Sequence, residues 1–220
     1  MAVNFDEMTL EDVRGHLAAM LPADAAFDGW TATALDSTAA RLGLDGDVAR
    51  LAFPDGAGQM IAAWFAHIDA HMLLALPAEK LAAMKIRDRI TALVEARLAE
   101  LAPHREALRR AQTWLANPLH AKQAAQLGWR AADAMWRAAG DQSVDYNHYT
   151  KRAILGSVYT ATLLVFVNDD SEDWAETRAF LARRIENIMQ FEKAKARWTS
   201  SPTRHFSMAR FLGRLRYPAN

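Results

Sequence analysis

The sequence predicts an all-α protein. Apolar residues recur at spacings of three and four along almost all of its 220 residues, and no segment sustains the apolar and polar alternation that a strand needs. Hydrophobic residues make up 51% of the chain, which is enough to bury a full core in one large or two small domains. The sequence contains no cysteine, so thiolate catalysis, disulfides and sulfur-bound metal centres are excluded.

Proline, glycine and short polar runs divide the chain into about nine or ten expected helices. The expected breaks are Leu21-Pro22, Phe53-Pro54, Leu76-Pro77, Ala102-Pro103, Asn117-Pro118, residues 140–146, residues 168–171 and Ser201-Pro202. The run from Asn168 to Ser171, followed by two acidic residues, is typical of a helix end and of an N-cap for the next helix. We therefore expect a well-defined helix from Trp174 to about Lys195.

The first of three predicted regions, residues 1–56, contains a helix-turn-helix pattern. An alanine-rich helix over residues 34–41 is followed by the turn Leu42-Gly43-Leu44 and a short helix over residues 45–51. The pattern resembles the N-terminal domain of TetR-type regulators, including Trp30 before the first helix and Phe53 before a proline. The resemblance implies a TetR-like fold, with a helical ligand-binding bundle over residues 57–198 and a C-terminal amphipathic helix in residues 199–220.

The charge of the first region argues against DNA binding. Up to Gly56 there are ten acidic residues and three arginines, a net charge of −7, and the expected groove-reading helix offers Asp45, Asp47 and only Arg50. Phosphate contacts need cations, and carboxylates repel phosphate. We expect no nucleic-acid partner and a structural role for this helix pair. A TetR-type ligand-responsive transcriptional regulator is the alternative.

The C-terminal region has the opposite charge. After Glu192 there is no acidic residue, and seven lysines and arginines give +7. A helix from about Pro202 to Tyr217 would separate an apolar side from an arginine-rich side, which is typical of a helix that lies in a membrane surface. The predicted membrane-binding residues are Phe206, Arg210, Phe211, Leu212, Arg214 and Leu215. Packing of this tail on its own core or on another subunit is the alternative.

The N-terminus and the apolar segments favour a cytoplasmic protein. Residues 1–10 include Asp6 and Glu7, where a signal peptide would need basic residues and then an apolar run. The longest apolar stretch, residues 153–167, is roughly five residues short of a bilayer span. We expect a buried helix there and no secretion.

The segment from Met135 to Leu155 is dense in aromatic and polar residues around an expected loop. It closely resembles the accessory proteins of ubiquinone biosynthesis that form the ninth COQ family. The resemblance runs from Gly29 through the tail, and the blocks Gly-Asp-Gln-Ser at 140–143 and Tyr-Thr-Lys-Arg at 149–152 are its most specific parts.

This resemblance implies a TetR-like fold that has given up DNA binding, and a function without catalysis. It implies that the protein presents ubiquinone intermediates to the di-iron demethoxyubiquinone hydroxylase, with its last helix on the membrane. The location implied is peripheral on the inner membrane, or on the mitochondrial matrix side in a eukaryote. The predicted hydroxylase-facing residues are Met135, Tyr146, His148 and Tyr149, with His148 where relatives can carry tryptophan.

Two apolar stripes, on the expected helices before and after this loop, are the predicted lipid site. Small residues at Gly128, Ala132 and Gly156 between the stripes would leave room for an elongated apolar cavity, although a filled core is the simpler interpretation of each residue. The ligand would be a phospholipid or an isoprenoid quinone, and no other cofactor is expected. The predicted lining residues are Trp129, Trp136, Leu155, Tyr159, Leu163 and Phe166.

Metal and catalytic sites are not predicted. His67 and His71 stand four apart around Asp69, which could place two imidazoles on one metal, but no third ligand follows at a motif spacing. Structural or surface histidines are therefore favoured. No catalytic triad order, nucleophile elbow or glycine-rich phosphate loop is present in the sequence. A purely structural adaptor with a filled core is the remaining alternative, and a homodimer through bundle faces is expected.

Overall fold

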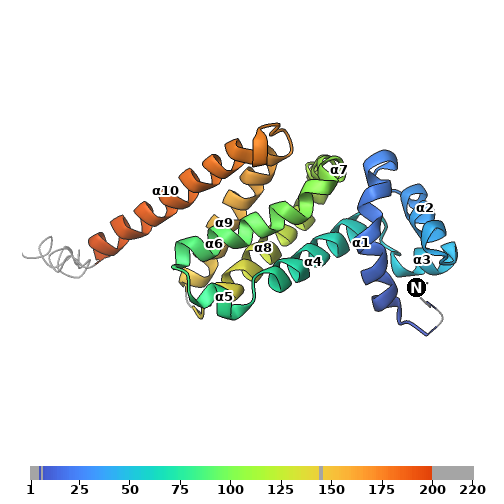
Figure 1. Cartoon of the computed structure of the whole chain (residues 1–220), viewed down its shortest axis with the longest axis horizontal. Coiled ribbons are helices and arrows are strands. Elements are labelled where there is room, and N and C mark those ends of the chain that lie inside the picture. The colour runs from blue at the N-terminus through green and yellow to red at the C-terminus, as the bar shows by residue number, and fades with distance from the viewer. Residues whose placement is uncertain (1–4, 6, 144–145, 200–220) are drawn as a thin grey trace, which may run out of the picture.

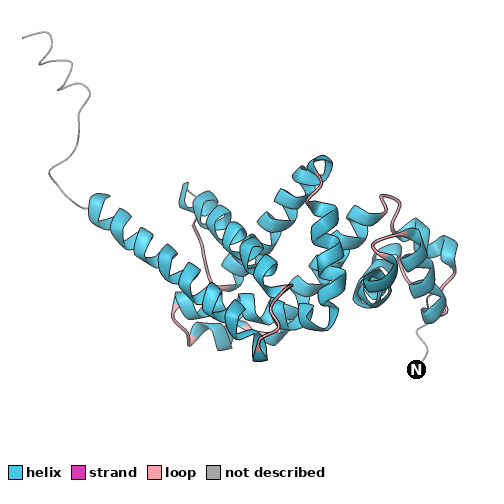
Figure 2. Ribbon diagram, turned by 90° about the horizontal axis from the view of Figure 1, so that it is seen from above, coloured by secondary structure: helices cyan, strands magenta, loops and turns pink. Residues whose placement is uncertain are grey.

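The computed structural model describes residues 5, 7–143 and 146–199. In these residues every regular element is a helix, which confirms the all-α prediction (Figure 2). The elements are α1 (Leu10–Asp28), α2 (Ala32–Leu42), α3 (Gly46–Ala52), α4 (Ala57–Ala75), α5 (Ala78–Ala82), α6 (Ile86–Leu101), η1 (Ala102–His104), α7 (Arg105–Leu115), η2 (Pro118–His120), α8 (Ala121–Ala138), α9 (Tyr146–Phe166), η3 (Glu172–Trp174) and α10 (Ala175–Thr199). The six predicted membrane-binding residues, from Phe206 to Leu215, lie outside the described residues.

Helix α1 runs straight through the first predicted break. Its N-terminus has a reciprocal cap between Thr9 and Asp12, and the helix continues past Pro22 to Asp28. The prediction of a break at Leu21-Pro22 is wrong. An interior proline costs about 3 kcal/mol, but Leu17 and Leu21 on the same helix are fully buried, and burial of one leucine contributes about 1.5–3 kcal/mol.

Helices α1 to α3 form the head of the molecule, at one end of the elongated structure (Figure 1). Gly43 takes a left-handed conformation with φ 70° between α2 and α3, as the predicted turn requires. The head is joined to the bundle by Trp30, whose ring lies 5.1 Å from that of Trp64 on α4. The Trp30 indole also donates a hydrogen bond of 3.0 Å to the carbonyl of Ala107 on α7.

The bundle is built on α4, α6, α8 and α9, with α10 packed on α9 and α6 (Figure 1). Helices α8 and α9 approach each other closely at two glycines. A Cβ atom added to Gly156 would lie 3.3 Å from the carbonyl oxygen of Gly128 and 3.8 Å from the Cβ of Ala132. The small residues singled out in the sequence therefore serve close helix packing at this level of the bundle.

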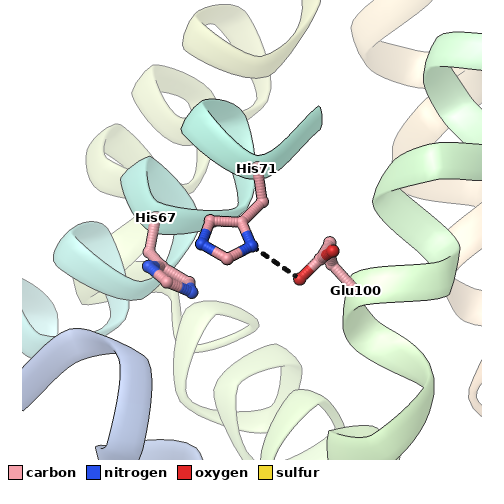
Figure 3. A group of neighbouring side chains, drawn as sticks. All are labelled: His67, His71 and Glu100. Carbon is pink, nitrogen blue, oxygen red and sulfur yellow. Dashed lines mark ion pairs between the residues drawn. The ribbon is translucent and has the colours of Figure 1, made fainter. Parts of the chain in front are cut away.

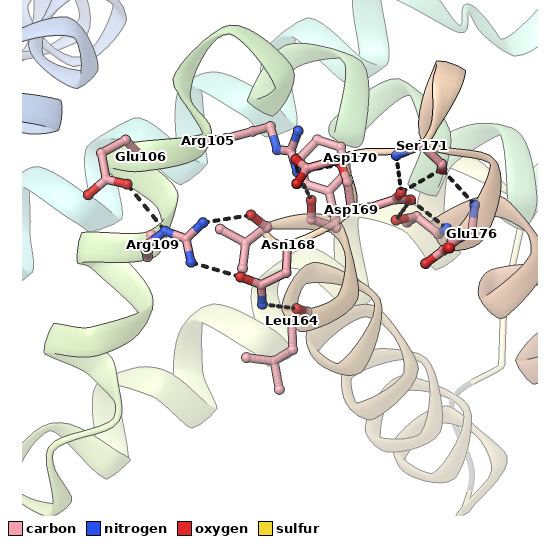
Figure 4. A network of polar contacts seen from close by, with 12 residues as sticks. Arg105, Glu106, Arg109, Leu164, Asn168, Asp169, Asp170, Ser171 and Glu176 are labelled. Atoms are coloured by element: carbon pink, nitrogen blue, oxygen red, sulfur yellow. Dashed lines mark hydrogen bonds and ion pairs between the residues drawn. The ribbon is translucent and has the colours of Figure 1, made fainter.

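The corner between α9 and α10 is held by a polar network (Figure 4). Buried Asp169 accepts hydrogen bonds from the backbone and hydroxyl groups of Ser171 and Thr177, at 2.5–2.9 Å. Burial alone would raise the pKa of Asp169, but these hydrogen bonds lower it below its usual range. From α7, Arg105 and Arg109 donate to the carbonyls of residues 166, 167 and 169. The predicted helix end and N-cap at this place are confirmed.

Among the residues that the structure describes, none of the helices combines the length and the apolar character needed to cross a bilayer.

Candidate ligand cavities and aromatic surface

An apolar cavity of about 210 Å³ lies where α6, α8, α9 and α10 meet. Two of the predicted lipid-binding residues, Trp136 and Leu155, contribute to it. Trp136 is fixed in place because its indole donates a 3.0 Å hydrogen bond to the carbonyl of Lys151. We call this space the isoleucine cavity; its lining residues are Ile86, Arg87, Ile90, Trp136, Lys151, Ile154, Leu155, Ile185 and Ile188.

The two cations of the isoleucine cavity are already engaged in ion pairs. The Nη1 of Arg87 lies 3.2 Å from Oε2 of Glu186 on α10, and the Nζ of Lys151 lies 2.8 Å from Oδ1 of Asp141. The ammonium group of Lys151 also stands 5.3 Å from the centre of the Trp136 ring. The cavity therefore combines an apolar lining with two positively charged side chains, each paired with a carboxylate.

A second cavity, of about 280 Å³, is lined by Tyr159 and Leu163 together with buried Arg97 of α6. We call it the arginine cavity. The guanidinium carbon of Arg97 lies 4.8 Å from the centre of the Tyr159 ring, and Arg97 forms an ion pair with Asp69 of α4. The Nε of Arg97 and the hydroxyl of Tyr159 have no hydrogen-bond partner outside this pair, and burial raises the pKa of that hydroxyl despite the opposing effect of Arg97.

The other two predicted lining residues lie elsewhere. Trp129 is 36% exposed on the outside of α8, and Phe166 is fully buried against Trp174, with ring centres 5.3 Å apart. The six predicted residues therefore do not line one elongated cavity. Trp129 and Trp136 lie two turns apart on one face of α8, but Trp136 lines the isoleucine cavity with α10 residues, whereas Trp129 borders a surface groove between α8 and α9. Helical spacing identifies a face, and the neighbouring helices decide where that face is covered.

Trp129 instead belongs to an exposed aromatic group with His148 and Tyr149, which we call the aromatic surface. The ring of Trp129 lies 6.3 Å from that of His148 and 6.0 Å from that of Tyr149. Tyr149 is 62% exposed, and the His148 Nδ1 lies 2.9 Å from the carbonyl oxygen of Ser143. Two of the predicted hydroxylase-facing residues are thus neighbours on the surface.

The remaining two predicted partner residues do not add to this surface. Met135 has no exposed area, so the prediction that it faces a partner is wrong. Its position on α8, three residues after Ala132 and four after Ala131, places it on the buried stripe of that helix. Tyr146 is the first residue of α9, and its side chain lies outside the described part of the protein.

An ion-pair network lies beside the aromatic surface. Arg152 is only 2% exposed and contacts Asp133 at 2.6 Å and Asp141 at 3.0 Å. Asp141 also accepts from Lys151 and from the Ser143 hydroxyl, both at 2.8 Å. Burial alone would raise the pKa of Asp141, but the hydrogen bonds lower it to about 2. The network fixes the loop that carries the Gly-Asp-Gln-Ser block.

Sequence reasoning singled out this block but gave its charged residues no role, and it missed Asp133. The available signal was a charged pair, Lys151 and Arg152, at the start of an otherwise apolar helix. Such cations need carboxylate partners when they are buried. Asp133 and Asp141, on the two sides of the end of α8, supply them.

The charges on the head agree with the argument against DNA binding. Arg50 of α3 lies 2.8 Å from Asp36 and 2.7 Å from Asp47. The single cation that α3 could offer to a phosphate is therefore already paired with two carboxylates.

Comparison with known proteins gives a consistent result. The sequence model of the COQ9 family matches residues 121–192, which cover α8, α9 and much of α10. The mitochondrial ubiquinone biosynthesis proteins COQ9 of Bos taurus and Homo sapiens are each 34% identical to this chain over 168 residues, 73% of this chain and 52% of theirs. The protein of the same name from Rattus norvegicus is 35% identical over 73% of this chain and 54% of its own length. The match thus spans about half the length of these relatives.

A solved structure supports the fold. The crystal structure of a TetR transcriptional regulator from Nitrosomonas europaea superposes with a TM-score of 0.65 at 24% sequence identity, over 81% of this chain and 99% of that one. The TetR-like fold is confirmed.

Proposed function

The chain belongs to the COQ9 family, and from that premise we propose that it is a non-catalytic accessory protein of ubiquinone biosynthesis. In this proposal it binds an isoprenoid quinone intermediate or another lipid and presents it to the di-iron demethoxyubiquinone hydroxylase. The relatives' names support the pathway. The observation that carries the lipid-binding step is the isoleucine cavity.

The size and lining of the isoleucine cavity suit part of a prenyl lipid. An apolar cavity of about 150 Å³ in another protein stays dry and binds benzene, and this one measures about 210 Å³. A ring-sized apolar group therefore fits inside. A longer prenyl chain would extend out of the cavity past the positively charged side chains of Arg87 and Lys151.

The arginine cavity supplies donors that suit a quinone oxygen. Arg97 Nε and the Tyr159 hydroxyl both carry hydrogen and both are buried, and neither has a hydrogen-bond partner outside the Arg97–Tyr159 pair. A buried polar group left unpaired costs about 1–3 kcal/mol. A quinone carbonyl within reach of either group would recover part of that cost, which supports a polar head group in preference to a purely apolar guest.

The first test is organic extraction and mass spectrometry of lipid that copurifies with the intact protein. We expect a stoichiometric quinone or phospholipid, and only background from a denatured and refolded sample. Ile154→Trp should fill the isoleucine cavity and reduce the recovered lipid to that background, whereas Leu74→Trp, on an exposed part of α4, should not. An empty wild-type protein that melts cooperatively would contradict lipid binding and favour the structural adaptor.

The aromatic surface is our proposed contact for the hydroxylase, because exposed Trp and Tyr side chains dominate many binding interfaces. Tyr149→Ala should weaken hydroxylase binding about 30-fold, the equivalent of a 2 kcal/mol contribution. Phe27→Ala provides the matched control, since Phe27 is an exposed aromatic residue on α1, in the head of the molecule. Equal binding of both variants and the wild type in a pull-down or titration would contradict this assignment.

Membrane contact rests on the predicted residues Phe206, Arg210, Phe211, Leu212, Arg214 and Leu215 and on the +7 charge of the tail. We propose peripheral attachment to the cytoplasmic face of the inner membrane, or to the matrix side in a eukaryote, as the relatives' mitochondrial names suggest. A chain that ends at Trp198 should no longer float with anionic liposomes. Persistent flotation would contradict the role of the tail.

Self-association and DNA binding complete the proposal. We propose a homodimer through α10 or through the outer faces of α8 and α9. Sedimentation equilibrium checks this, and a monomer would contradict it.

The transcriptional-regulator alternative requires DNA retention at moderate salt. The pairing of Arg50 with Asp36 and Asp47 argues against it.

A further inference from the structure

Three ligand-type side chains, none of which belongs to the aromatic surface, meet between two helices of the bundle (Figure 3). His67 and His71 lie one turn apart on α4, and Glu100 reaches them from α6. All three side chains are half-buried, and their ligand atoms all lie within 4.8 Å of one another. The sequence shows no third ligand at a motif spacing from the two histidines. In the structure that ligand is Glu100, which comes from a different helix.

The spacing of these atoms is close to that around a tetrahedral metal ion. Zinc bonds to imidazole nitrogen and carboxylate oxygen are about 2.1 Å long, which places the ligand atoms about 3.4 Å apart. The distance from His71 Nδ1 to Glu100 Oε2 is already 3.3 Å, and the centres of the two imidazole rings lie 4.0 Å apart. Because no ligand-atom separation exceeds 4.8 Å, the largest decrease needed to reach the tetrahedral spacing is roughly 1.4 Å.

The local charges also suit a cation. Asp69 lies between the two histidines in sequence, but its carboxylate pairs with Arg97 and not with either imidazole. The carboxylate of Glu100 pairs with His71 and belongs to the same close group as His67, so one anionic oxygen donor lies near both imidazoles.

We propose that His67, His71 and Glu100 form a binding site for a borderline divalent transition-metal ion, with zinc as the best match. Two imidazoles and one carboxylate are the ligand set of many zinc and non-haem iron sites. Three protein ligands leave a fourth position of a tetrahedral ion open to water. Because the ligands come from α4 and α6, the bound ion would cross-link two helices of the bundle.

The experiment uses the full chain, stripped of metal with a chelator and titrated with Co²⁺, which reports tetrahedral coordination by its visible absorption. We expect one equivalent of Co²⁺ to bind and to be displaced by Zn²⁺. His71→Gln and Glu100→Gln should each weaken binding at least about tenfold, the lower end of the effect of losing even an outer partner of a metal ligand. Zinc should raise the melting temperature of the wild type but not of these variants.

His16→Gln is the matched control, because it removes an exposed histidine on α1 that is not in the cluster. It should bind Co²⁺ like the wild type. Absence of a tetrahedral Co²⁺ spectrum in the folded wild-type protein would overturn the proposal, whatever the variants do. Unchanged affinity in Glu100→Gln and His71→Gln, with normal circular dichroism, would also overturn it.

Discussion

Neutralising Asp141 should destabilise the protein substantially. In Asp141→Asn the side chain keeps its size but loses the charge that pairs with Lys151 and Arg152. Hydrogen bonds to charged groups contribute about 1.5–3 kcal/mol each, and removal of one partner from a buried ion pair costs about 3–5 kcal/mol. Arg152 keeps Asp133 and Lys151 is partly exposed, so we expect a loss of about 2–3 kcal/mol.

Thermal and urea unfolding at pH 7, followed by circular dichroism, measure this loss. For a chain of this size, 1 kcal/mol corresponds to about 2–4 °C, so the melting temperature should fall by roughly 4–12 °C. The pKa of Asp141 is lowered from 3.8 to about 2 in the folded state. Its contribution is therefore complete above about pH 4 and is lost as the pH falls through about 2, so the difference between variant and wild type should narrow in that window.

Asp170→Asn is the matched control. The side chain of Asp170 is 97% exposed, and its nearest cation, Arg105, is 3.7 Å away, so the same chemical change should alter the melting temperature little. The reasoning is refuted if Asp141→Asn melts with the wild type at pH 7. A stability difference that stays constant from pH 7 down to pH 2 would refute the assignment of the charge as its cause.

Three further substitutions test the packing of α8 on α9 and the corner between α9 and α10. Gly128→Ala should raise the free energy of unfolding by about 0.5–1 kcal/mol, because its new methyl group meets only Thr160 Oγ1 at 3.8 Å. Gly156→Ala should leave the free energy of unfolding unchanged or lower it by about 1–3 kcal/mol, because its methyl group would press against the Gly128 carbonyl. Equal urea midpoints for the two variants would contradict this packing. Asp169→Ala should cost about 2 kcal/mol by removing the acceptor for Ser171 and Thr177, and an unchanged unfolding free energy would show that the cap contributes nothing.

Local rules predicted much of the fold. The turn at Gly43 and the cap at Asn168 to Ser171 were predicted correctly, because residues a few positions apart determine them. Pro22 was misjudged because the local penalty of an interior proline is outweighed by the tertiary burial of α1, which comes from distant helices.

The sites were predicted less completely for the same physical reason. Helical periodicity placed Trp136, Leu155 and Tyr159 on inward faces, and they line cavities. It could not show that Trp129 lies partly exposed at the surface beside His148 and Tyr149 of α9, or that Met135 is buried in the core. Glu100 joins His67 and His71 only through the packing of α6 on α4, across 29 residues of sequence from the nearer histidine.

Helix α7 connects the two ends of the protein, and this bears on why the head is retained. Its Arg105 and Arg109 hold the corner between α9 and α10, while Ala107 between them accepts the hydrogen bond of Trp30. A truncated chain that began at Ala57 would expose Trp64 to water and deprive Ala107 of its donor. The first three helices therefore cover one end of the bundle. Selection for a stable fold would preserve them even if they had no role in DNA binding.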